Sequence, residues 1–131
     1  MSKILTHAPA FILAGFLIMM GAQKFGAENI IFATIAERSG IALFEPTIRM
    51  ATGAGEIAAA LLLLLPKTRF LGALGAVAII GGAIMFHLSP WLGIEVVMTP
   101  GGKPTPALFM MALGSFALAV FTLMTTRTKK A

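Results

Sequence analysis

Four long stretches of the chain are almost entirely apolar, and polar residues gather in the segments between them. Each stretch is close to the roughly 20 residues that an α-helix needs to cross the hydrocarbon core of a bilayer. Four strands could not close a barrel, so each spanning segment has to be helical. The pattern predicts an all-α, integral membrane four-helix bundle with helices at residues 4–23, 46–65, 70–88 and 106–125.

Prolines mark the ends of these stretches. Pro46 and Pro106 stand at first-turn positions, where the missing N–H of proline costs nothing. Pro66 and Pro90 follow the second and third stretches, where proline ends a helix. The length leaves no room for a second domain, so residues 1–131 are expected to form a single transmembrane domain.

The connection between the first two stretches is too long for a simple turn. Residues Asn29 to Arg38 predict a short helix with Ile31 and Ile35 on one side, and Gly40 suits the position after its end. We expect an interfacial or lid-like helix here. The last connection has Trp91 at the depth of the membrane interface and a Pro-Gly-Gly turn.

Composition supports a lipid environment and excludes several kinds of chemistry. The chain is 58% hydrophobic and 11% charged, and a soluble domain would carry about twice that charged fraction. Its mean hydropathy is +0.94. Because there is no cysteine, disulfides, zinc-thiolate sites, iron–sulfur ligation and thiol redox chemistry are excluded. Any redox role would need a cofactor or a partner, since the chain predicts no intrinsic cofactor.

The net charge of +5 is spread over helix ends and not gathered on one face, so we interpret it as topology and not as a nucleic-acid surface. By the positive-inside rule, both termini should be cytoplasmic in an inner (plasma) membrane, and the long loops extracytoplasmic. Six basic and no acidic residues fall on the inner side, namely Lys3, Lys67, Arg69, Arg127, Lys129 and Lys130. The outer side mixes Glu28, Glu37, Glu45 and Glu95 with Lys24, Arg38 and Lys103.

The first stretch also has features of a signal peptide. Lys3 precedes the apolar run, and Gly21 and Ala22 offer a weak cleavage-like site. However, the run is long for the apolar region of a signal peptide, and its removal would leave three helices with a reversed charge bias. We therefore expect it to remain as the first spanning helix.

Two ionisable residues, Arg49 and Glu56, lie inside the second stretch, where charges are costly. Seven residues apart, they share one helix face with an axial gap of about 10 Å. They could form an ion pair that holds helices together or the wall of a polar pocket, and the two interpretations are compatible. In the pocket interpretation Arg49 would hold the charge of Glu56.

His87 lies near the outer end of the third stretch, on the same face as small residues that let another helix approach. The only other histidine, His7, is expected near the opposite membrane face, so the sequence predicts no metal site. A role for His87 in hydrogen bonding or proton handling is favoured.

Gln23 and Lys24 end the first stretch. Lys24 could simply snorkel to the interface. However, Gln23, Lys24, Arg49 and His87 all fall within about one helical turn of the outer boundary, and Glu56 falls about 15 Å from Pro46. This layer predicts a cavity open toward the outer side. The inner half offers no comparable groups, which argues against a channel or pump.

The motifs GAQKFG, TGAGEIAAALLLLLP and KTRFLGALGAVAIIGGAIMFHLSP together resemble the DoxX-like family of small four-helix membrane proteins, over nearly the whole chain. The matching positions are Lys24, Gly53, Glu56, Gly72, Ala83 and His87. The resemblance implies association with quinone-linked sulfur oxidation or with membrane oxidoreductase complexes that protect against oxidative stress. More distant relatives bind sterol-like ligands or help other membrane proteins assemble.

The leading hypothesis is a pocket for a quinone or other lipid-like small molecule, in a subunit of a membrane redox complex. Glu56 and His87 would bind a ligand oxygen or exchange protons with it, and no residue is assigned a catalytic role. Expected partners are membrane lipid, a membrane or extracytoplasmic redox protein, and a second copy of the chain. Two alternatives stay open: a non-catalytic scaffold or assembly factor, and a transporter protomer.

Overall fold

The computed structural model describes residues 3–26 and 29–130, with side chains throughout except at residues 3, 5, 6 and 127–130. The described part is all-α, as predicted, with one short 3-10 helix. Its elements are α1 (Lys3–Gln23), α2 (Ile30–Ser39), η1 (Ala42–Phe44), α3 (Thr47–Leu64), α4 (Arg69–His87) and α5 (Ala107–Lys130). The predicted bounds are close for the first three stretches, whereas α5 continues beyond residue 125 to Lys130.

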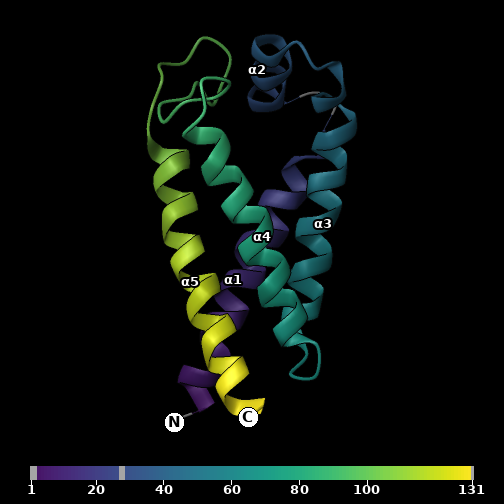
Figure 1. The fold of residues 1–131 in the computed structure, drawn as a ribbon, viewed down its shortest axis with the longest axis vertical. Helices are drawn as coiled ribbons and strands as arrows, with labels where there is room; N and C mark the ends of the chain where they lie inside the picture. Colours follow the sequence, from purple (N-terminus) through teal and green to yellow (C-terminus); the bar gives the residue numbers. More distant parts are fainter. Residues whose placement is uncertain (1–2, 27–28, 131) are drawn as a thin grey trace.

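Within the described residues, three helical segments are long and apolar enough to cross a membrane, which indicates a membrane protein. They are Ala42–Leu64, Arg69–His87 and Ala107–Thr126. The apolar part of α1, His7–Gln23, is shorter. α1 nevertheless extends along the bundle with the other three long helices (Figure 1).

The four long helices form a bundle with two different ends (Figure 1). The terminal end holds the start of α1, the end of α5 and the turn between α3 and α4. The opposite end is covered by α2 and by the loop of residues 88–106, which together we call the cap. From the turn that joins them, α3 and α4 move apart toward the cap, so the bundle opens in that direction.

Small residues allow close packing toward the terminal end. A Cβ atom added to Gly72 of α4 would lie 2.7 Å from the backbone nitrogen of Leu63 and 2.8 Å from the carbonyl oxygen of Ala59, both on α3. The small-residue pattern at Gly72 and Ala76 thus serves contact within the chain. The main core consists of Leu13, Ala14, Leu17, Ala59, Ala60, Leu63, Ala73, Ala76, Ile80, Ala112 and Ala119.

The short helix predicted between the first two stretches is present as α2, and its interfacial position stays a prediction. The side chain of Asn29 accepts hydrogen bonds from the backbone N–H groups of Ile31 and Phe32, and so caps the helix N-terminus. Gly40 ends it with φ of 76°, the left-handed conformation expected after a helix.

The 88–106 loop joins α2 in the cap. A β-bridge pairs Val96 with Thr105 across the loop, and the predicted Pro-Gly-Gly turn lies between them. Arg38 of α2 donates a hydrogen bond of 3.1 Å to the carbonyl of Leu92. Ile35 of α2 and Leu92 and Val96 of the loop form an apolar cluster with Phe44 of η1.

Candidate functional site

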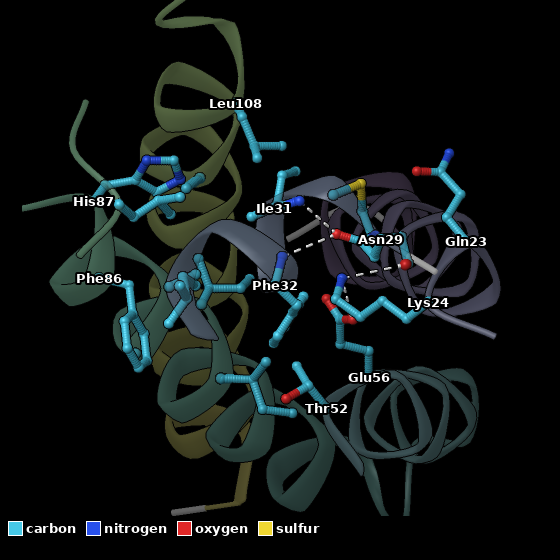
Figure 2. A pocket seen from close by; sticks show the side chains of 18 of the residues that line it. Gln23, Lys24, Asn29, Ile31, Phe32, Thr52, Glu56, Phe86, His87 and Leu108 are labelled. Carbon is cyan, nitrogen blue, oxygen red and sulfur yellow. Dashed lines mark hydrogen bonds and ion pairs between the residues drawn. The ribbon is translucent and has the colours of Figure 1, made fainter. Parts of the chain in front are cut away.

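A cavity of about 840 Å³ lies beneath the cap, where the helices diverge. Its volume is within the range of small-molecule sites. All five α-helices contribute to its lining, which is mostly aliphatic and aromatic (Figure 2). The polar lining residues are Gln23, Lys24, Asn29, Thr52, Glu56, His87 and Ser115.

The wall formed by α1 and α3 depends on a glycine contact. A Cβ atom at Gly21 would lie 2.9 Å from the carbonyl oxygen of Gly53, and one at Gly53 would lie 2.9 Å from the carbonyl oxygen of Gly21. Only glycine allows the two backbones to approach this closely. The contact brings the last turn of α1 against α3, and so places Lys24 near Glu56.

Lys24 and Glu56 form a buried ion pair on this wall (Figure 2). Lys24 Nζ lies 2.7 Å from Glu56 Oε1, and the two side chains are only 11% and 8% exposed. Lys24 also donates to the carbonyl of Met20, at 3.3 Å. The snorkelling interpretation of Lys24 is therefore wrong. Glu56 Oε1 accepts no other hydrogen bond from the described residues.

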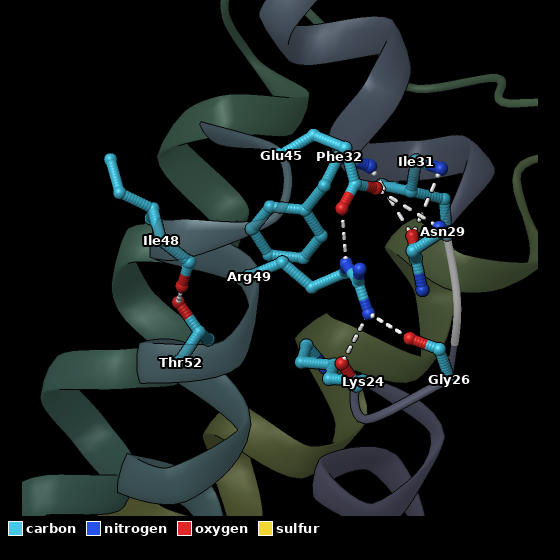
Figure 3. A network of polar contacts seen from close by, with 9 residues as sticks. All are labelled: Lys24, Gly26, Asn29, Ile31, Phe32, Glu45, Ile48, Arg49 and Thr52. Carbon is cyan, nitrogen blue, oxygen red and sulfur yellow. Dashed lines mark hydrogen bonds and ion pairs between the residues drawn. The ribbon is translucent and has the colours of Figure 1, made fainter. Parts of the chain in front are cut away.

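Arg49 does not line the cavity. Its side chain is fully buried above the ion pair, where its Nη1 donates to the carbonyls of Lys24 and Gly26 at 2.6 and 2.8 Å (Figure 3). These carbonyls follow the last turn of α1, where helix geometry provides no partners. Its Nε donates to Glu45, one turn earlier on the chain. We expected Arg49 to hold the charge of Glu56, whereas the structure gives that role to Lys24.

Sequence reasoning missed Glu45 as a structural residue. One carboxylate oxygen accepts from Arg49, and the other accepts from the backbone N–H of Asn29 at 3.0 Å. Because Asn29 caps α2, the Glu45–Arg49 pair connects the end of α1, the start of α2 and the start of α3. The spacing of four residues was the available signal for this pair.

His87 and Glu56 lie on opposite walls of the cavity, which Ile31 and Phe32 of α2 also line (Figure 2). His87 is 3% exposed, and its Nδ1 lies 2.9 Å from the carbonyl oxygen of Gly93. The ring also packs edge-on against Phe109. Glu56 and His87 thus line the same cavity from different walls, and their role in ligand binding or proton exchange stays a prediction.

Gln23 is peripheral to the cavity. Its side chain is exposed, and in Figure 2 its amide points away from Glu56. Of the five residues predicted for the site, Lys24, Glu56 and His87 contribute directly, Gln23 lies at the edge, and Arg49 lies outside.

Four methionines, which the sequence analysis did not single out, line the cavity. They are Met19, Met20, Met98 and Met111. Met19 and Met20 are neighbours on α1, and both reach the cavity although they point in different directions. Methionine side chains are flexible and polarizable, so they adapt to apolar ligands of varied shape.

A second buried arginine, Arg69, lies at the terminal end. Sequence reasoning counted it only as a cytoplasmic charge, yet it is 3% exposed. Its Nε donates to the carbonyl of Leu63 at 2.9 Å, its Nη1 lies 3.1 Å from His7 Nδ1, and its guanidinium carbon lies 5.7 Å from the ring centre of Phe11. Within the described residues, no group of three or more His, Asp or Glu side chains could hold a metal ion.

No family model, curated protein or solved structure matches the chain. The resemblance to the DoxX-like family therefore remains a prediction from the sequence motifs.

Proposed function

We propose that the chain crosses an inner (plasma) membrane four times, with both termini cytoplasmic and the cap on the outer side. The packing of α1 along α3 supports a fourth span, because Leu13 and Leu17 of α1 belong to the main core. The basic turn at Lys67 lies at the same end of the bundle as both termini, which supports the orientation. The side chains of Lys3, Arg127, Lys129 and Lys130 lie outside the described part of the chain.

Within this topology, we propose that the cavity binds an amphipathic, lipid-like small molecule such as a quinone. The observation that carries the proposal is the Lys24–Glu56 ion pair, which is buried on the wall of a large and mostly apolar cavity. Maintaining two charges in such a place is costly. A ligand with an apolar body and a polar head would use both parts of the cavity, its head lying at Glu56 and its body against the methionines and aromatic rings.

The chain itself supplies no electron carrier, so a redox role would belong to a complex in which this protein holds the lipid-like molecule for a partner. That assignment follows the DoxX-like resemblance. The scaffold alternative differs in one measurable respect, because a scaffold needs no ligand in the cavity.

The proposal can be tested by mass spectrometry of small molecules retained after purification in nanodiscs. Two glycines form a matched pair, since a Cβ atom at either meets nothing within 4 Å. Gly82 lines the cavity and Gly15 does not. We expect Gly82→Phe to lose a molecule that the wild type and Gly15→Phe both retain. Circular dichroism would verify that both variants are folded.

Two results would contradict the proposal. One is that no molecule is enriched over the lipid of protein-free nanodiscs. The other is that folded Gly82→Phe retains as much of it as Gly15→Phe. Either result, with all three proteins folded, would favour the scaffold.

A further inference from the structure

The hydroxyl groups in the cavity are already used as donors. Thr52 Oγ1 donates to the carbonyl of Ile48 at 2.8 Å, and Ser115 Oγ donates to the carbonyl of Ala112 at 3.2 Å. Each hydroxyl has a single proton, so each oxygen can offer a ligand only its lone pairs. Thr52 is on α3 and Ser115 is on α5, which places one such acceptor on each side of the cavity.

The two ionisable groups on opposite walls are also acceptors. Glu56 Oε1 is buried beside Lys24 Nζ, at 2.7 Å, and accepts no further hydrogen bond among the described residues. An ionised carboxylate has about four lone-pair sites, so it can also accept from a ligand. The Gly93 carbonyl can only accept, so its contact with His87 assigns the proton to Nδ1. In the neutral ring the other nitrogen, Nε2, is then an acceptor.

The donors are confined to one side. Lys24 directs its ammonium group toward Glu56 and the Met20 carbonyl, and Asn29 retains its amide N–H groups because its oxygen caps α2. Both belong to the α1–α2 side of the cavity. The lining contributed by α4 and α5 includes His87 and Ser115, which both present acceptors.

We infer that the preferred ligand is an apolar molecule with two hydroxyl groups, one donating to Glu56 and the other to His87 on the opposite wall. The inference rests on the proposed function, because it specifies the ligand of the same cavity. A carbonyl or ether oxygen at the His87 wall would leave acceptors facing acceptors, so among quinone-type molecules the cavity prefers the reduced, dihydroxy form to the oxidised quinone. Buried polar groups left unpaired in this way reject a ligand more strongly than a missing apolar contact does.

A matched series of probes tests the donor requirement. Dihydroxybiphenyl has one hydroxyl on each ring, and its monomethyl and dimethyl ethers retain the shape of the body but lose one or both donors. Binding to wild-type protein in nanodiscs is measured by equilibrium dialysis against protein-free nanodiscs. Emission of Trp91, the only tryptophan, provides a local signal because its ring packs against Phe44 and Phe86, which both line the cavity.

We expect the affinity to fall about tenfold or more with each methylated hydroxyl. A fall of this size corresponds to the free energy lost when a buried acceptor is left without its hydrogen bond. In His87→Phe, which retains an aromatic ring beside Phe109, the monoether should bind as tightly as the diphenol. If this variant does not fold, the wild-type series alone decides. Equal affinity of the wild type for diphenol and dimethyl ether would overturn the donor requirement only. Absence of binding by all three probes would overturn the proposed function as well.

Discussion

The two ends of the bundle each contain a buried arginine, but the packing around them differs. At the terminal end, α3 and α4 are in backbone contact at Gly72, and the core is filled by alanine and leucine. At the cap end the same helices are apart, and a cavity of about 840 Å³ occupies the space. Arg49 is buried at the cap end, next to the cavity, and Arg69 is buried at the terminal end, next to the tightly packed core.

The difference separates two uses of buried charge. Both arginines donate to carbonyls at or just beyond a helix C-terminus, Arg49 to Lys24 and Gly26, and Arg69 to Leu63. In each case the arginine satisfies groups that the helix leaves unpaired. Lys24 also donates to the carbonyl of Met20 in the last turn of α1, but its ion pair with Glu56 lines the cavity, whereas Arg49 and Arg69 do not. We therefore interpret the two arginines as structural, and the Lys24–Glu56 pair as the part of the proposed binding site that carries charge.

Removal of the arginine at the cap should have the largest effect. Arg49→Met leaves Glu45 without its ion pair and removes the donor to two carbonyls, so we expect a loss of about 3–5 kcal/mol in unfolding free energy. SDS-induced unfolding in mixed micelles measures it. Hydrogen exchange should also accelerate in α2, because Glu45 holds the N–H of Asn29. An Arg49→Met protein with wild-type stability and α2 protection would contradict the structural role.

Disruption of the α3–α4 backbone contact at the terminal end should have the next largest effect on stability. Gly72→Ala places a methyl group against the backbone of α3, and we expect a loss of about 1–3 kcal/mol in unfolding free energy. Gly15→Ala is the matched control, since it adds the same group where nothing lies within 4 Å. That control should be neutral or up to about 1 kcal/mol more stable, because alanine favours helix over glycine. Equal stability of the two variants would show that α3 and α4 are not in backbone contact at Gly72.

A double-mutant cycle can separate the ion pair from its surroundings. Lys24→Met and Glu56→Gln should each destabilise the protein, because each leaves one partner buried alone. The double variant should lose less unfolding free energy than the two single variants combined, which corresponds to a coupling energy of about 1–2 kcal/mol. Additive effects in SDS unfolding would mean that the pair does not interact in the membrane. The same double variant should lose ligand retention despite its recovered stability, and retention at the wild-type level would contradict the binding role.

Sequence patterns predicted the helices well because apolar runs, prolines and caps act locally. The N-terminus of α2 at Asn29 and its end at Gly40 follow from the residues at those two positions. The number of membrane spans and their orientation remain predictions. Residue depth along each helix also identified three cavity residues correctly, namely Lys24, Glu56 and His87.

Pairing of the charges could not be predicted in the same way. Arg49 and Glu56 share a helix face, but partner choice depends on how closely α1 approaches α3, which the Gly21–Gly53 contact determines. That contact joins residues 32 positions apart in the sequence, and neither glycine identifies its partner by itself. The burial of Arg69 was missed for a similar reason, since its partners His7 and Phe11 come from the distant α1.

The smallest expected effect concerns how the cap is fastened over the cavity. Arg38→Ala removes one hydrogen bond, from α2 to the Leu92 carbonyl, and should cost only about 0.5–1 kcal/mol in unfolding free energy. Its consequence should be kinetic, because a cap that opens more often releases a bound probe faster. We expect dihydroxybiphenyl to dissociate several-fold faster from Arg38→Ala than from wild type, as followed by Trp91 emission. Lys103→Ala, a change at an exposed position of the same loop, is the matched control. Unchanged dissociation from Arg38→Ala would mean that the probe leaves between the helices without displacement of the cap.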